Sequence, residues 1–140
     1  MSKLEEQERR IALIIADGDI NGELYKSPKT VQKFRNYLKE NIDFPCMLTG
    51  IEDFPWEERY VFGYGDQEEY EELKKTNPSY KDVFELLEFE DTEDEQIIVQ
   101  VRRQKDRKKF SIVLDYLEAT DKRSRNYQLL DDYACWYVNY

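Results

Sequence analysis

The first apolar pattern along the chain is helical. A charged lead of good helix formers is followed by four closely spaced aliphatic residues, Ile11, Leu13, Ile14 and Ile15. This arrangement predicts a helix over Glu5–Ala16, although the run IALII is also compatible with a strand.

A second helix is predicted over Pro28–Asn41. Ser27 is a good N-cap residue, and proline is well suited to the first helical position. The apolar residues of this segment fall three and four positions apart and form one stripe: Val31, Phe34, Leu38 and Ile42.

Beyond residue 43 the period changes to that of β-strands. Turn-forming stretches separate five apolar runs, which are predicted strands: Phe44–Ile51, Glu58–Gly63, Asp82–Glu90, Gln96–Arg103 and Phe110–Leu117. Between the second and third runs, Asp66 can cap a short helix that extends to Lys75, and Asn77-Pro78 ends it.

The C-terminal segment Tyr127–Tyr140 has helical spacing and predicts a short aromatic helix or, as an alternative, a final strand. The fold class is therefore α+β: N-terminal helices, a small, strongly twisted antiparallel β-sheet or barrel of about five strands, and a C-terminal helix. Closure into a barrel would remove the exposed edges of the sheet. A chain of 140 residues is expected to form a single domain, residues 1–140.

The composition narrows the classes of partner. The net charge is −10, from 21 basic and 31 acidic residues, so the chain repels phosphate backbones and anionic lipid. We expect neither nucleic acid nor membrane partners.

The aromatic content of 14% separates the chain from disordered acidic tails. No apolar run approaches the roughly 20 residues of a membrane span, and the charged start MSKLEEQERR is unlike a signal peptide, so a cytoplasmic protein is expected.

Several kinds of catalytic site are excluded by residue type. The chain has no histidine, which removes the common general base, the Ser/His/Asp and Cys/His arrangements and most zinc sites. Gly63 and Gly65 lack the spacing of a nucleotide-binding loop. Cys46 and Cys135 stand in apolar settings and are interpreted as buried thiols. We therefore expect a protein that is not an enzyme.

The segment Thr49–Leu73 is the densest in acids and aromatics. Nine of its residues are Asp or Glu, and only Arg59 opposes them. Alternating apolar residues give the segment a core that would hold carboxylates close together, and a hard divalent cation relieves their repulsion. The bend at Phe54-Pro55-Trp56 therefore marks a candidate Ca2+ site with the ligands Glu52, Asp53, Glu57, Glu58 and Asp66. The alternative is that these acids cap turns and face solvent.

A second candidate site lies between the two N-terminal helices. Asp17, Asp19 and Asn21, followed by Gly22, match the first half of an EF-hand loop. The match then fails, because position twelve is Pro28, where a complete loop has a bidentate Glu. A plain Asn-Gly turn is the alternative. A third acidic group, expected to bind weakly on a turn, contains Asp91, Glu93 and Asp94.

One basic cluster interrupts the acidic chain, at the turn after the fourth predicted strand. Its members are Arg102, Arg103, Lys105, Arg107, Lys108 and Lys109. A solvated turn that protects strand edges is the favoured interpretation, with a patch for an anionic partner as the alternative. An acidic strand beside this one would also gain from cross-strand charge pairing.

Four strings resemble the small cyanobacterial calcium-binding proteins of the CcbP type: FPCMLTGIEDFPWEERYVFG, EYEELKKTNPSYKDVFELL, KKFSIVLDYLEAT and NYQLLDDYACWYVNY. The resemblance extends from about Ser27 to the C-terminus. It implies an acidic cytoplasmic protein, linked to control of free calcium, that binds Ca2+ reversibly without a full EF-hand. The acids inside the matched strings are Glu52, Asp53, Glu57, Glu58, Asp115, Glu118, Asp131 and Asp132. The last two precede an aromatic run and could also cap the final helix.

Together these observations predict a protein that buffers or senses free Ca2+ through surface carboxylates, with calcium ions as partners. The alternative is an acidic protein-interaction module that binds a basic partner without a specific ion.

Overall fold

Two helices at the start of the chain confirm the helical predictions. The computed structural model describes residues 2–19, 22, 24–92 and 95–140. Helix α1 covers Lys3–Ile15, so the strand alternative for IALII is wrong, and helix α2 covers Pro28–Asn41. The Ser27 hydroxyl accepts a hydrogen bond from the backbone N–H of Thr30, and the Thr30 hydroxyl accepts one from the N–H of Ser27. This pair satisfies two donors that a helix start otherwise leaves without partners.

Five strands form one antiparallel sheet in the order β4-β3-β2-β1-β5. Their bounds are Met47–Gly50 (β1), Phe84–Phe89 (β2), Ile98–Arg103 (β3), Lys109–Val113 (β4) and Leu117–Ala119 (β5). Within the described residues β4 and β5 are edge strands that do not pair with each other, so the sheet is open and the barrel alternative is wrong. The α+β class is confirmed. The expected cross-strand charge pair is present between Glu85 and Arg102, which are register partners.

The second predicted strand, Glu58–Gly63, is wrong. A 3-10 turn at Pro55–Glu57 (η1) leads into a short helix at Glu58–Val61 (α3). Proline presets a helical backbone angle, and the Glu57 side chain accepts a hydrogen bond from the backbone N–H of Phe54, so the start of the turn is satisfied locally. These local contacts outweigh the alternating pattern of the segment.

The fifth predicted strand, Phe110–Leu117, is only partly right. It breaks at a 3-10 turn over Leu114–Tyr116 (η2), which separates β4 from β5. The break lets β5 cross over and pair with β1 at the opposite edge of the sheet. The turn also places Asp115 near the C-terminal helix.

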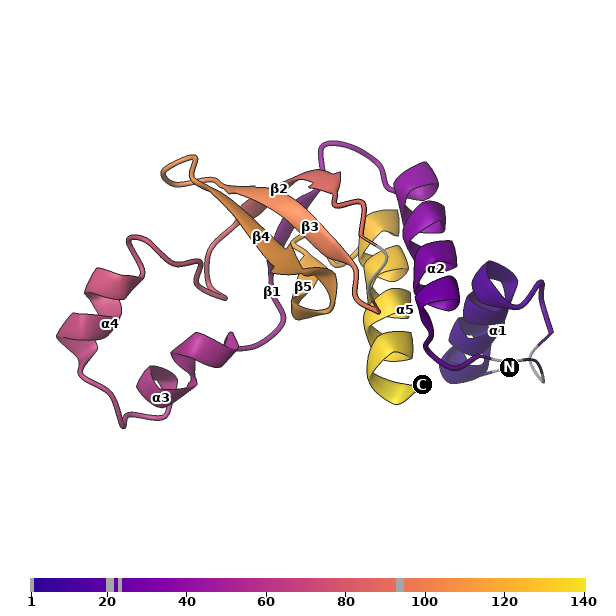
Figure 1. Cartoon of the computed structure of the whole chain (residues 1–140), viewed down its shortest axis with the longest axis horizontal. Coiled ribbons are helices and arrows are strands. Elements are labelled where there is room, and N and C mark those ends of the chain that lie inside the picture. The colour runs from indigo at the N-terminus through magenta and orange to yellow at the C-terminus, as the bar shows by residue number, and fades with distance from the viewer. Residues whose placement is uncertain (1, 20–21, 23, 93–94) are drawn as a thin grey trace.

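The C-terminal helix α5 (Arg125–Asn139) completes the core, and the final-strand alternative is wrong. In Figure 1, α5 lies between the sheet and the helix pair α1 and α2. The Phe34 ring of α2 stacks on Trp136 with a centroid distance of 5.0 Å, and the Trp136 indole N–H donates to the carbonyl of Leu24. Ser124 is the N-cap of α5, so the alternative in which Asp131 and Asp132 cap the helix is wrong.

Residues 51–79, here called the arm, leave the sheet after β1 and return before β2. The arm holds η1, α3 and helix α4 (Gln67–Leu73), whose N-cap is Asp66 as predicted. Figure 1 shows α3 and α4 at the opposite end of the molecule from α1 and α2. The rings of Tyr60 and Tyr70 stack with a centroid distance of 5.0 Å, and Trp56 packs edge-on against both. The arm thus has a small aromatic core of its own.

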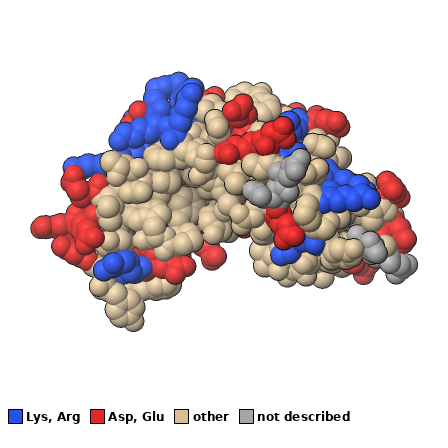
Figure 2. Space-filling model, viewed as in Figure 1, with Lys and Arg blue, Asp and Glu red and all other residues tan. Residues whose placement is uncertain are grey.

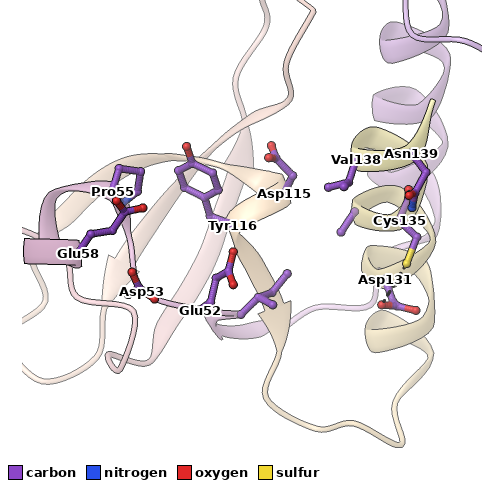
Figure 3. A pocket seen from close by; sticks show the side chains of 12 residues that line it. Glu52, Asp53, Pro55, Glu58, Asp115, Tyr116, Asp131, Cys135, Val138 and Asn139 are labelled. Atoms are coloured by element: carbon purple, nitrogen blue, oxygen red, sulfur yellow. Dashed lines mark hydrogen bonds between the residues drawn. The ribbon is translucent and has the colours of Figure 1, made fainter. Parts of the chain in front are cut away.

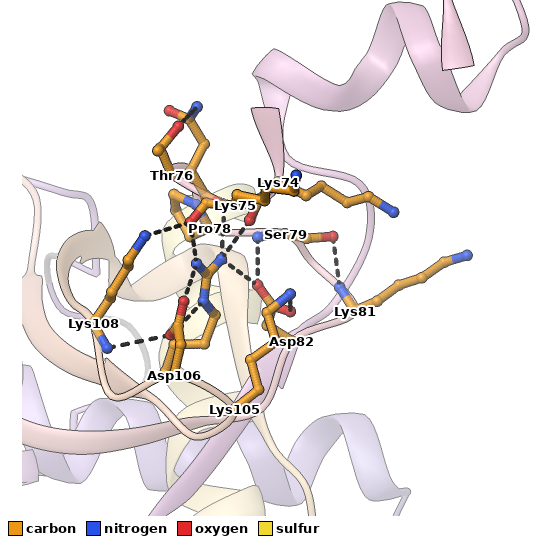
Figure 4. A network of polar contacts seen from close by, with 12 residues as sticks. Lys74, Lys75, Thr76, Pro78, Ser79, Lys81, Asp82, Lys105, Asp106 and Lys108 are labelled. Carbon is orange, nitrogen blue, oxygen red and sulfur yellow. Dashed lines mark hydrogen bonds and ion pairs between the residues drawn. The ribbon is translucent and has the colours of Figure 1, made fainter. Parts of the chain in front are cut away.

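Arg103 joins the base of the arm to the β3–β4 hairpin (Figure 4). Its guanidinium is fully buried and donates to the carboxylates of Asp82 and Asp106. The same group donates to three arm carbonyls, those of Lys74, Lys75 and Asn77. The basic cluster of the sequence is therefore divided: Arg103 is an internal connector, whereas its neighbours from 104 to 109 are exposed.

No described helix is long and apolar enough to span a membrane.

Candidate metal centre

Glu57 organises the acidic bend from inside the arm. Its side chain is fully buried, and one carboxylate oxygen accepts hydrogen bonds from the backbone N–H groups of Phe54 and Tyr80. The other oxygen accepts a hydrogen bond from the Tyr70 hydroxyl at 2.9 Å. Burial, together with this bond to an acceptor, raises the pKa of Tyr70 to about 12. Glu57 thus serves the internal hydrogen-bond network of the arm, apart from the other acids of the bend.

The other acids at the start of the arm border a cavity of about 450 Å³ between the arm and α5. We call it the carboxylate cavity. Its acidic lining residues come from three segments and are Glu52, Asp53, Glu58, Asp115 and Asp131. Figure 3 shows Glu52 and Asp115 between the 53–58 segment on one side and α5 on the other. Apolar lining comes from Ile51, Ala134 and Val138, among others.

Asp115 is the most unusual group in the cavity. Its Oδ1 atom is buried and has no hydrogen-bond partner among the described residues. Burial raises the pKa of the Asp115 carboxyl, while a backbone hydrogen bond and the charge of Lys26 oppose this rise. An unpaired buried carboxylate oxygen costs free energy, and folded proteins rarely keep one without a compensating partner.

Asp131 of α5 borders the carboxylate cavity. Its carboxylate accepts a hydrogen bond from the Gln7 amide at 3.2 Å. The next residue, Asp132, is buried and forms a two-bond ion pair with Arg10 of α1. Asp132 therefore fixes α1 to α5, whereas Asp131 remains exposed at the cavity mouth.

The donors around the cavity suit a hard cation, since five carboxylates, Tyr116 and Asn139 supply oxygens and the lining has one thiol, Cys135, and no histidine. Within the described residues, however, no three acidic or sulfur ligands lie close enough to hold one ion. Glu52 and Glu58 are exposed and able to change rotamer. A shared ion therefore requires side-chain movement across the cavity or water molecules that complete the shell.

The remaining predicted ligands lie elsewhere. Asp66 is exposed and caps α4 by accepting from the backbone N–H of Glu68. Asp17 and Asp19 are exposed in the loop between α1 and α2, where Asp17 has a left-handed φ of 52°. Asn21 lies outside the described residues. The structure therefore keeps this loop apart from the carboxylate cavity.

The third acidic group is described only in part. Asp91 is exposed and lies 3.4 Å from the guanidinium of Arg35. Glu93 and Asp94 lie outside the described residues.

Asp115 and Asp131 were not among the candidate ligands drawn from local acid density. Each is separated by more than fifty residues from Glu58, and neither stands in a dense acidic run of its own. The signal that includes both is the resemblance, since they lie in the strings KKFSIVLDYLEAT and NYQLLDDYACWYVNY.

Two solved structures share this fold. A crystal structure of Anabaena CcbP matches with a TM-score of 0.59 and 18% identity, over 97% of this chain and 92% of that one. A calcium-binding protein in its calcium-binding form matches with a TM-score of 0.58 and 20% identity, over 99% of this chain and 96% of that one. The predicted resemblance is thereby confirmed at the level of the fold. No protein-family model and no curated protein matches the chain.

Proposed function

We propose that this protein, which has the fold of CcbP, binds Ca2+ in the carboxylate cavity. The observation that carries the proposal is the buried, unpaired Oδ1 atom of Asp115 in a cavity bordered by four further carboxylates. The description of one solved protein of this fold as calcium-binding supports it. A bound cation would compensate the buried oxygen and the mutual repulsion of its neighbours.

The residues proposed to hold the ion are Glu52, Asp53, Glu58, Asp115 and Asp131. Calcium takes six to eight oxygen ligands at about 2.3–2.6 Å in flexible geometry and accepts water and backbone carbonyls among them. That tolerance suits a site whose carboxylates come from separate segments. Magnesium demands a compact octahedron at about 2.0–2.1 Å, which this dispersed set is poorly arranged to supply.

In this proposal the chain is a cytoplasmic, non-enzymatic protein that buffers or senses free Ca2+. The two roles differ in their structural consequence. A sensor changes the position of the arm relative to α5 when the ion binds, whereas a buffer binds the ion with little change. Comparison of amide chemical shifts in the arm with and without Ca2+ separates them.

Thermal unfolding tests calcium binding directly. Calcium that binds only the native state at one hundred times its dissociation constant adds about 2.7 kcal/mol of stability. For a chain of this size we expect a rise in Tm on the order of 5–10 °C at physiological salt. The same concentration of Mg2+ is the control and should give a smaller rise. No rise with millimolar Ca2+, or equal rises with both ions, contradicts the proposal.

A further inference from the structure

The loop between α3 and α4 presents an apolar patch to solvent at the end of the arm. Phe62 and Tyr64 are 67% and 87% exposed, and Val61 beside them is 39% exposed. Single exposed apolar residues are ordinary, but three large ones within four positions form a patch. We call Val61, Phe62 and Tyr64 the arm loop. None of the three lines the carboxylate cavity.

The arm loop is held in a fixed conformation by contacts that do not use these side chains. The backbone N–H groups of Tyr64 and Gly65 both donate to the carbonyl of Arg59 at 2.9 Å. Gly63 has a φ of 84°, which strongly favours glycine. A Cβ atom at Gly65 would lie 2.4 Å from the ring of Tyr60, so the loop closes tightly on the aromatic core of the arm. The backbone that carries the exposed side chains is thus preorganised, so binding costs little backbone ordering entropy.

The surroundings of the arm loop are acidic. Glu58, Asp66 and Glu68 are exposed and form no ion pair within the described residues. Arg59 is the only basic residue from position 57 to 72, against seven acids. Figure 2 shows acidic side chains gathered over α4 at this end of the molecule. An apolar centre with a charged rim is the arrangement of a protein-binding surface.

We propose that the arm loop docks a basic, amphipathic segment of another protein. The apolar side of that segment covers Phe62 and Tyr64, and its Lys or Arg residues face the carboxylates of Glu58, Asp66 and Glu68. Aromatic residues at the centre of a patch carry most of the binding energy in such interfaces. The interaction shares only Glu58 with the proposed calcium site, and its apolar centre lies outside that site.

Charge decides between this partner and the other possible occupants. Anionic membranes and nucleic acids are repelled by the acidic rim and by the net charge of −10. A second copy of the chain carries the same net charge, so self-association is opposed as well. A basic partner gains from both the local rim and the overall field.

The test is an NMR titration of the 15N-labelled full chain in EDTA, which keeps it independent of calcium. The probe is a helical peptide with one Leu face and one Lys face. Two comparison peptides carry Glu in place of Lys or Ser in place of Leu. We expect amide shifts centred on residues 61–65 with the Leu/Lys peptide and much weaker binding of both comparison peptides. Equal binding of the Glu peptide, or shifts centred elsewhere, overturns the proposal.

Substitutions then distinguish binding through the apolar side chains of the arm loop from general charge attraction. F62A/Y64S should weaken binding of the Leu/Lys peptide by about tenfold or more, because it removes the aromatic centre. L4A/Y140S is the matched control, since Leu4 and Tyr140 are exposed apolar residues on other elements. Unchanged affinity in F62A/Y64S, or an equal loss in the control, contradicts the assignment. A concentration-dependent dimer that the F62A/Y64S change abolishes would overturn the choice of partner.

Discussion

Two carboxylates in this fold differ in whether their buried oxygens have hydrogen-bond partners. Glu57 is fully buried, and its oxygens accept three hydrogen bonds, from the backbone of Phe54 and Tyr80 and from the Tyr70 hydroxyl. Asp115 keeps one buried oxygen that has no hydrogen-bond partner in the part of the chain that the structure describes. A satisfied carboxylate stabilises the segment that surrounds it, whereas an unsatisfied one lowers stability unless a ligand binds it. Glu57 thus maintains the arm, and Asp115 is the residue best placed to bind an ion.

The substitution D115N tests this difference. Because burial raises the pKa of Asp115, the folded state binds the proton more tightly than the unfolded chain does, so the ionised carboxylate destabilises the fold at neutral pH. We expect D115N to raise the calcium-free stability by about 1 kcal/mol at pH 7. This gain should shrink as the pH falls through the folded pKa of Asp115. Thermal unfolding with and without Ca2+ measures both effects.

With Ca2+ present, we expect the wild type to be more stable than D115N, the reverse of the order without calcium. The wild type should gain stability from the ion, and D115N should gain little. The proposed role of Asp115 is contradicted if D115N has a lower Tm than the wild type in EDTA and still shows the full calcium-dependent rise in Tm.

At the scale of elements, the arm depends on the connection that Arg103 makes to the hairpin. The Arg103 guanidinium hydrogen-bonds to Asp106 and lowers the pKa of that carboxyl from 3.8 to about 2. A lowered carboxyl pKa contributes stability above the unfolded value, and this contribution is lost as the pH falls.

D106N should therefore be less stable than the wild type at neutral pH, and the difference should disappear between about pH 4 and pH 2. Urea unfolding at a series of pH values measures it. E88Q, which removes an exposed carboxylate of β2, serves as the control and should follow the wild type. A D106N deficit that persists unchanged at pH 2 would show that the Asp106–Arg103 pair is not its source.

Most elements were predictable from the sequence because their signals are local. Ser27 and Asp66 marked helix starts, and alternation marked β2 and β3. The errors came where tertiary contacts decide. The segment at 58–63 alternates like a strand, yet Glu57 accepts a local hydrogen bond from the N–H of Phe54 and a distant one from the N–H of Tyr80, and the segment forms turns and a short helix.

The candidate site was predictable only in part, for the same reason. Glu52, Asp53 and Glu58 stand close together in the sequence and also border one cavity. Asp115 and Asp131 join them only because η2 and α5 pack beside the arm. The burial that singles out Asp115 cannot be obtained from the composition of its neighbourhood.

At the scale of the whole molecule, the net negative charge favours positively charged ligands and partners. A net charge of −10 concentrates cations near the surface, and the proposed site in the carboxylate cavity would hold one of them after its side chains move or with water in the shell. The same charge favours a basic partner at the arm loop. The two proposed sites share only the exposed Glu58, so either can fail without the other.

The central claim is tested most directly by calorimetric titration of Ca2+ into three proteins at physiological salt. These are the wild type, D53N/D115N in the carboxylate cavity, and D17N/D19N in the α1–α2 loop, which removes the same charge elsewhere. We predict saturable heat for the wild type and D17N/D19N, and a loss of affinity of about tenfold or more for D53N/D115N. Equal affinity in all three proteins, or a loss confined to D17N/D19N, would contradict the account.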